Sequence, residues 1–172
     1  MRQLIFVVET NDSSLTDDRY IKKLINYRYD LNNNEFKLQF IHMNGKNNYC
    51  NKSIKTKINN LIVMNKKSEN YVIYCFDTDK IDSNPIDNEI FNSEKDYCFK
   101  NNYKLIWFCY DIEYVLLGHS VESNKKKQES IKYIQNNKIT IPVNKLFEKD
   151  NIHKGSSNIY NVLDDPLSSI IK

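Results

Sequence analysis

Three short apolar runs constrain the fold of this chain more than any other feature of its sequence. They are Leu4–Val8 (LIFVV), Tyr71–Phe76 (YVIYCF) and Tyr103–Cys109 (YKLIWFC), and all are rich in β-branched or aromatic residues. Such runs are typical of strands buried on both faces, as in parallel sheets covered by helices. A fourth segment, Phe36–Met43 (FKLQFIHM), alternates apolar and polar residues and predicts a further strand.

Helical spacing of apolar residues fills the intervals between these strands. The expected helices start near Ser14 (with Asp17 in a capping-box-like position), cover Ile54–Met64 and Ile86–Lys100 (with Pro85 near the first turn), run from Asp111 to about Gly118, and cover about Lys125–Asn137. A polar break at Asn32–Asn34 precedes the second strand, and signals after the last helix are weak. Strands that alternate with helices predict one α/β domain over residues 1–172, with a mainly parallel central sheet flanked by helices.

Composition narrows the class of protein. A chain of 172 residues with 40% hydrophobic residues is about one globular domain in size. The net charge of +3 permits nucleic-acid binding without arguing strongly for it. The apolar run near the N-terminus is too short for a signal peptide, and no apolar stretch approaches the roughly 20 residues of a membrane span. We therefore expect a cytoplasmic protein without a membrane partner.

Several kinds of site are disfavoured by residue usage. Three glycines cannot form a P-loop or a dinucleotide fingerprint, which argues against kinases, NTPases and Rossmann dehydrogenases. The four cysteines, Cys50, Cys75, Cys98 and Cys109, form no C-x-x-C pair, so a zinc or thioredoxin-like site is not expected. Cys75 and Cys109 lie within apolar runs, where a reduced thiol packs as a small hydrophobe.

Acidic residues follow two of the apolar runs directly. Glu9 comes after the run Leu4–Val8, and Asp77 and Asp79 come after the run Tyr71–Phe76. In parallel α/β sheets ligands bind beyond the carboxyl ends of the strands, and carboxylates brought together there need protons or a cation. Alternation along an extended D-T-D would point Asp77 and Asp79 the same way. We predict a Mg²⁺ or Mn²⁺ site at Glu9, Asp77 and Asp79, the alternative being acids that only cap helices or face solvent.

A second group of candidate residues follows the predicted strand Tyr103–Cys109. Asp111 and Glu113 begin a helix there, and His119 follows its end. Asp111 is expected mainly as a helix cap, whereas for Glu113 a catalytic role and a structural role stay equally open. His119 is a candidate general acid or base, metal ligand or phosphate contact, with capping of carbonyls at the helix end as the stronger expectation. His42 and His153 show no convincing neighbours in the sequence.

Lysines supply candidate phosphate contacts. Lys125, Lys126 and Lys127, with Lys132, suit a phosphate backbone, although a solvated helix face is the commoner role for such a run. Lys22 or Lys23 would neutralise a substrate phosphate if it lay near the carboxylate edge.

The order of these motifs resembles RloB-like proteins and their Toprim domain. An apolar strand ends at Glu9, a Thr/Asp-containing loop leads to Tyr20, and a D-x-D follows a later apolar strand. The segment CYDIEYVLLGH, residues 109–119, is similar to a short aromatic, leucine-rich and histidine-containing segment of the family. The resemblance spans roughly residues 4–135.

This resemblance implies a Toprim-like fold with a Mg²⁺-dependent nuclease-type site, in a group associated with bacterial defence against phage. It matches Glu9 with the first acidic residue, Asp77 and Asp79 with the D-x-D, and Glu113 and His119 with the later motif. Toprim proteins commonly carry Gly after the glutamate, where this chain has Thr10.

Two classes of function follow as expectations. The first is a metal-dependent phosphodiesterase or nuclease acting on DNA, RNA or a small nucleotide. The second is a catalytically inactive Toprim-like binding module, either an adaptor or sensor with a protein partner in a defence system or a phage-encoded inhibitor. The sequence leaves the oligomeric state open, a homo-oligomer included.

Overall fold

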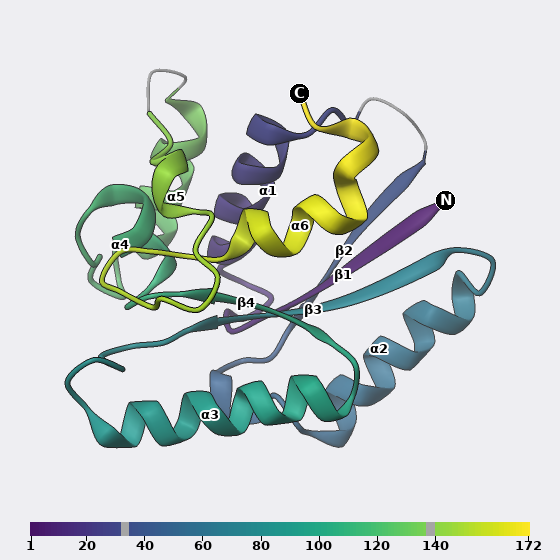
Figure 1. Ribbon diagram of the computed structural model, residues 1–172, viewed down its shortest axis with the longest axis horizontal. Helices are drawn as coiled ribbons and strands as arrows, with labels where there is room; N and C mark the ends of the chain where they lie inside the picture. The colour runs from purple at the N-terminus through teal and green to yellow at the C-terminus, as the bar shows by residue number, and fades with distance from the viewer. Residues whose placement is uncertain (32–34, 137–139) are drawn as a thin grey trace.

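A sheet of four parallel strands forms the centre of the protein, as seen in a computed structural model that describes residues 1–31, 35–136 and 140–172 (Figure 1). The strands are β1 (Arg2–Val8), β2 (Phe36–His42), β3 (Glu69–Asp77) and β4 (Lys104–Phe108), in the order β2-β1-β3-β4. Each strand was expected from the sequence, and its ends differ from the expectation by two residues at most. The predicted fold class, α/β with a parallel central sheet flanked by helices, is confirmed, and this arrangement is consistent with a Toprim-like fold.

Helices cover both faces of this sheet (Figure 1). One face carries α1 (Thr16–Arg28), α4 (Ile112–Leu117), α5 (Lys126–Gln135) and α6 (Ile159–Leu167), and the other carries α2 (Lys52–Met64) and α3 (Pro85–Lys100). Because successive strand side chains point to opposite faces, β1 supplies Leu4 and Phe6 to one core and Ile5 and Val7 to the other. This double burial explains why the first strand is apolar throughout.

The start of α1 differs from the expectation. The helix begins at Thr16, and the preceding Leu15 has a left-handed φ of 50° and no side-chain cap. Asp17 does not close a capping box, because its Oδ2 accepts the backbone N–H of Thr10 at 3.3 Å. The acid therefore ties the loop after β1 to the first turn of the helix.

Helix α6 lies in the region where the sequence signals are weak. It is only nine residues long and contains Pro166, which obscures its helical pattern. Its buried Leu163 packs into the core, and Asp164 accepts hydrogen bonds from the guanidinium of Arg28 at 2.7 and 2.6 Å. The C-terminal segment thus stabilises α1 from the outside.

The outer edge of β4 is covered by side chains. The carboxamide of Asn158 accepts the N–H of Trp107 and donates to the carbonyl of Leu105, both at 2.9 Å. The hydroxyl of Ser157 donates to the carbonyl of Trp107 at 2.7 Å. These groups make the contacts that a neighbouring strand would otherwise make.

Other expectations from the sequence fare as follows. Cys75 and Cys109 are buried free thiols, as predicted. Over the described ranges, no helix is both long and apolar enough to cross a membrane. The break predicted at Asn32–Asn34 and the predicted helix end at Asn137 lie outside the described residues. In the described part of the chain, helix α5 ends at Gln135.

Candidate functional site

Four carboxyl groups meet at the carboxyl edge of the sheet, and we refer to them as the acidic cluster. Glu9 follows β1, Asp17 lies in the first turn of α1, Asp77 ends β3, and Glu113 lies in the first turn of α4. The negative charges of Glu9, Asp17 and Glu113 all act on Asp77. Two of the four, Glu9 and Asp77, belong to the predicted metal site, and Glu113 belongs to the second predicted group.

Backbone N–H groups hold three members of the cluster in place. The Oε1 of Glu9 accepts the N–H of Asp77 at 2.9 Å, and the Oδ1 of Asp77 accepts the N–H of Ile112 at 3.0 Å. Asp17 accepts the N–H of Thr10. The ends of β1 and β3 and the start of α4 are therefore joined through carboxylates, which fixes the geometry of the edge.

Burial makes ionisation of the cluster unfavourable. It raises the pKa of Glu9 to about 8, although the N–H of Asp77 and the charge of Lys46 oppose the rise. Burial, together with the charge of Glu113, raises the pKa of Asp17 to about 6. Burial and the charges of Glu9 and Asp17 raise the pKa of Asp77 well above its ordinary value. At neutral pH the cluster must hold protons or attract a cation.

Glu113 is the most deeply buried member of the cluster. Its side chain is 0% exposed, and its Oε2 pairs with the ammonium of Lys126 at 2.9 Å. Burial raises the pKa of Glu113, while Lys126 acts in the opposite direction. Burial lowers the pKa of Lys126, but the charge and hydrogen bond of Glu113, together with the charges of Asp77 and Asp111, outweigh burial, and the net pKa is raised. The Oε1 of Glu113 is buried and accepts no hydrogen bond from any described residue.

Asp79 is placed differently from the expectation. The extended D-T-D chain assumed for a shared metal site is absent, because β3 ends at Asp77 and Asp79 has a left-handed φ of 50°. The backbone N–H of Asp79 donates to the carbonyl of Tyr110 at 3.0 Å. The exposed carboxylate of Asp79 pairs with Lys46. The spacing of the motif alone therefore does not set the directions of its two acids.

The residues around α4 divide into a cap and an outlier. Asp111 caps the helix as expected, since its Oδ1 accepts the N–H of Tyr114 at 2.6 Å. His119 is exposed, and its Nδ1 lies 3.2 Å from the carbonyl of Ser120, beyond the helix end. Among the contacts of the described residues, none joins His119 to the acidic cluster. Its predicted part in the site gains no support from the geometry.

An open pocket lies beside Glu9. Its volume is about 370 Å³. It is lined by Glu9, Thr10, Asn11, Ser14, Thr16, Asn44, Gly45, Ser123, Lys126 and Lys127. A carboxylate and two ammonium groups at one opening suit an anionic ligand that is bound together with a cation. A larger pocket of about 410 Å³ between α3 and β4 contains no member of the acidic cluster.

No protein-family model, curated protein or solved structure matches this chain. The site is therefore interpreted from its own chemistry.

The acidic cluster has the type of ligand that a Mg²⁺ site uses, but its side chains are not arranged to coordinate the ion directly. Within residues 1–31, 35–136 and 140–172, no three His, Cys, Asp or Glu side chains are arranged to hold a metal ion. Yet the Oε2 of Glu9, the Oδ1 of Asp17 and the Oδ2 of Asp77 accept no hydrogen bond from the described residues. Carboxylate oxygens are the ligands that Mg²⁺ prefers. The carboxylate oxygens of the acidic cluster therefore suit Mg²⁺ as ligands, and these side chains would have to change rotamer to coordinate the ion directly.

Four residues of this region were missed in the sequence as members of one site. Asp17 looked like part of a helix cap, and Lys126 was only one of a run of lysines. Lys46 lies in a polar loop without a recognisable motif. Glu94 lies on α3, and its charge acts on Glu9 and Lys46. It gives the clearest signal in the sequence, because it shares a helical face with Phe91 and Cys98, and an acid on an apolar face is expensive to bury.

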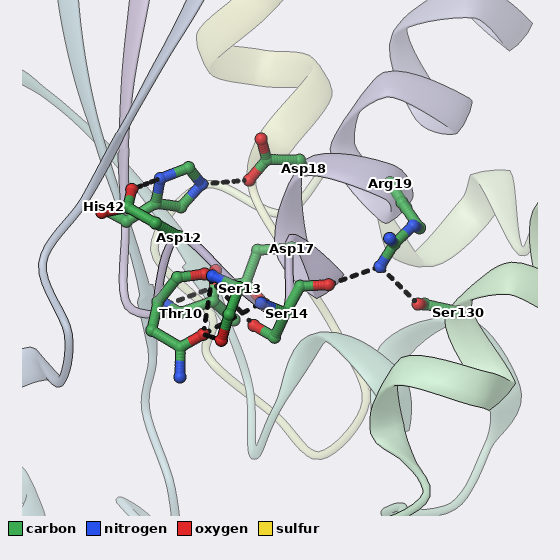
Figure 2. Close-up of polar contacts among 10 residues, drawn as sticks. Thr10, Asp12, Ser13, Ser14, Asp17, Asp18, Arg19, His42 and Ser130 are labelled. Atoms are coloured by element: carbon green, nitrogen blue, oxygen red, sulfur yellow. Dashed lines mark hydrogen bonds and ion pairs between the residues drawn. The ribbon is translucent and has the colours of Figure 1, made fainter.

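His42 has two acidic partners, which corrects the expectation that it lacks neighbours. Its Nδ1 lies 2.6 Å from Asp12 and its Nε2 lies 2.8 Å from Asp18 (Figure 2). Asp18 is buried, whereas Asp12 is exposed. The ring thereby links the end of β2 to the loop and helix that follow Glu9. The ring of His153, by contrast, has only the carbonyl of Asn151 within hydrogen-bond distance among the described residues, with Glu148 at 3.9 Å.

We expect His42→Leu to lower the free energy of unfolding by about 3 kcal/mol, because it leaves the buried Asp18 without its partner. Urea unfolding measures this loss. Asp12→Asn is the matched control on the exposed side of the same ring, and its effect is expected to stay below about 1 kcal/mol. Equal losses in the two variants would contradict the assignment of Asp18 as the important contact.

The other predicted basic residues lie in varied places. Lys127 donates to the carbonyl of Ser13 at 3.3 Å and lines the pocket. Lys22 lies over the ring of Phe40, and Lys23 donates to the carbonyl of Ile134. Lys125 and Lys132 form exposed ion pairs with Glu122 and Glu129 within their own helical region. The geometry favours Lys126 and Lys127 as the candidate phosphate contacts.

Proposed function

We propose that this protein is a Mg²⁺-dependent phosphodiesterase, with a nucleic acid as its substrate. The observation that carries the proposal is the hydrogen-bonded pair of Glu9 and Asp77 at the ends of two adjacent parallel strands. Burial raises the pKa of both carboxyl groups, so that a divalent cation would relieve an unfavourable arrangement of like charges. The resemblance to RloB-like proteins supports the same chemistry and a role in defence against phage.

The residues of the site would have different roles in such a reaction. Glu9 and Asp77 would hold the Mg²⁺ ion, with Asp17 beside them. When bound, the ion would polarise a phosphoryl oxygen and lower the pKa of a bound water. The N–H of Asp77 orients Glu9, and Ile112 orients Asp77. If Glu9 lies beside the ion without binding it, its pKa of about 8 lets it accept or release a proton near neutral pH instead.

Two lysines on α5 suit the substrate. Lys126 and Lys127 line the pocket that also contains Glu9. Their ammonium groups would bind the phosphate oxygens of a DNA or RNA backbone, or of a small nucleotide, close to the cation. Glu113 pairs with Lys126 and holds it at the pocket wall.

A second candidate function, a binding module without catalysis, has an observation of its own in its favour. Lys46 and Lys126 already place positive charge next to Asp79 and Glu113, so that part of the acidic edge is neutralised without a metal. The presence of Thr10 after the glutamate does not favour this alternative. Thr10 has no positive φ, so its backbone does not require glycine, and its N–H is used by Asp17.

Cleavage assays on labelled DNA and RNA, single- and double-stranded, with and without Mn²⁺, test the proposal. We expect cleavage only with the cation, and its loss in Glu9→Gln because the amide is a poorer ligand and cannot titrate. Asp165→Asn is the control, since this exposed acid pairs with Lys104 at the start of β4, the end of the strand opposite the acidic cluster. The absence of Mn²⁺-dependent cleavage in the wild type, or full activity in Glu9→Gln, would contradict the proposal and favour the binding module.

A further inference from the structure

The ammonium of Lys46 lies among oxygen atoms at the acidic edge, where a metal ion would otherwise be expected. It pairs with the Oδ2 of Asp79 and lies 3.5 Å from the backbone carbonyl of Asp77. The charges of Glu9 and Glu94 also act on it. Its side chain is only 17% exposed. A positive charge that is paired with one carboxylate, lies near a carbonyl and is acted on by two further carboxylates has surroundings that suit a hard cation.

The loop after β2 holds Lys46 in this position. Met43 donates its N–H to the carbonyl of Val8 at 2.9 Å, and Gly45 donates its N–H to the carbonyl of Glu9 at 2.8 Å. Gly45 has a φ of 108°, a conformation that other residues rarely adopt. The loop therefore runs directly beside the end of β1, and Lys46 starts next to Glu9. The ammonium itself is carried on a flexible four-carbon stem and can leave.

Glu94 is the second and independent sign of a cation position. Its side chain projects from α3 and is 1% exposed, and neither carboxylate oxygen accepts a hydrogen bond from a described residue. Its charge acts on Lys46 and on Glu9, so Glu94 lies within electrostatic range of both. A buried carboxyl group without a partner is costly unless a donor or a cation supplies one. Lys46 alone does not satisfy it.

We propose that Lys46 is a tethered counter-ion that competes with a divalent cation for Asp79 and Glu94, and so regulates cation binding at the acidic edge. The proposal rests on the cation-dependent function proposed above and deepens it. With Lys46 in place, its ammonium is paired with Asp79 and its charge acts on Glu94. When the ammonium withdraws, both carboxylates become available to a divalent cation close to Glu9. The cation and the ammonium cannot occupy the position together, because their like charges repel at this distance.

Mn²⁺ binding to the full chain, measured by electron paramagnetic resonance of the free ion, tests the competition. We expect Lys46→Met to bind Mn²⁺ about tenfold more tightly than the wild type, because the neutral thioether side chain keeps the length but loses the charge. Lys46→Arg keeps the charge and should bind like the wild type. In Lys46→Met/Glu94→Gln the gain should disappear. Circular dichroism and thermal unfolding establish that each variant is folded, and Lys46→Gln carries the same expectation if Lys46→Met does not fold.

The outcomes separate this inference from the proposed function. Equal, weaker or undetectable Mn²⁺ binding in Lys46→Met would overturn the competition, and so would a gain that persists in Lys46→Met/Glu94→Gln. Tighter binding in Lys46→Met without nucleic-acid cleavage by the wild type would support the competition while the nuclease proposal fails. If the wild type cleaves nucleic acid with Mn²⁺ but Lys46→Met has the same Mn²⁺ affinity, the nuclease proposal is supported and the competition fails.

Discussion

Asp77→Asn is expected to reduce Mn²⁺-dependent phosphodiester cleavage about a thousandfold or more without lowering the melting temperature. The carboxamide keeps an oxygen that can accept the N–H of Ile112, so the start of α4 stays anchored. It loses the negative charge that would hold the cation next to Glu9. Loss of metal-assisted stabilisation of the transition state amounts to several kcal/mol, and about 4 kcal/mol corresponds to a thousandfold in rate.

Stability is the control on this result. The pKa of Asp77 is raised by burial and by the charges of Glu9 and Asp17, so removing its charge relieves repulsion in the metal-free protein. The melting temperature of Asp77→Asn should therefore equal or exceed that of the wild type. Cleavage by Asp77→Asn at the wild-type rate would show that the Asp77 carboxylate has no role in the reaction. A large fall in melting temperature would mean that its role is structural.

The free energy of unfolding is expected to fall as the pH rises from about 4.5 to about 8. Burial raises the pKa of Glu9 and of Glu94 from 4.5 to about 8 in the folded protein, and that of Asp17 from 3.8 to about 6. Between the unfolded and folded pKa values, the folded state binds more protons than the unfolded state. Stability is therefore fully present below the unfolded pKa and is lost as the pH rises through the folded value. Each group contributes about 1.4 kcal/mol per pH unit within its window.

Glu94→Gln isolates one of these groups. Urea unfolding at a series of pH values should give a slope that is shallower than that of the wild type by about 1.4 kcal/mol per pH unit between about pH 5 and about pH 8. Glu122→Gln, which changes an exposed acid, should keep the wild-type slope. A wild-type stability that is constant or rises over this interval would show that the buried carboxyl groups are ionised without cost.

The sheet could be predicted because its strands carry local signals. Leu4–Val8 is buried on both faces, and this burial requires the apolar run that the sequence displays. Helix α6 could not be predicted in the same way. It is short, contains Pro166 and is stabilised largely by distant residues, such as Arg28 through Asp164. An ion pair between residues so far apart in the chain leaves no local signal for α6 in the sequence.

The candidate site was predictable only where a strand positions its residues. Glu9 and Asp77 follow buried strands, and their carboxyl groups lie at the same sheet edge as expected. Asp79 lies after the strand has ended, where it forms an isolated bridge with Tyr110, and the spacing of the motif does not encode its positive φ. Lys46 depends on a loop that returns to the end of β1, so its place among the acids follows from tertiary hydrogen bonds alone.

The coverage of β4 by Asn158 and Ser157 bears on how this protein avoids aggregation. The strand KLIWF is short, apolar and aromatic, and as an edge with open backbone groups it would favour intermolecular cross-β pairing. Asn158 occupies the N–H of Trp107 and the carbonyl of Leu105, so another chain finds no open ladder there. Extension of the sheet by an added strand would have to occur at the opposite edge, along β2. The side chains of Asn158 and Ser157 thus occupy backbone groups of β4 through which another chain would have to pair.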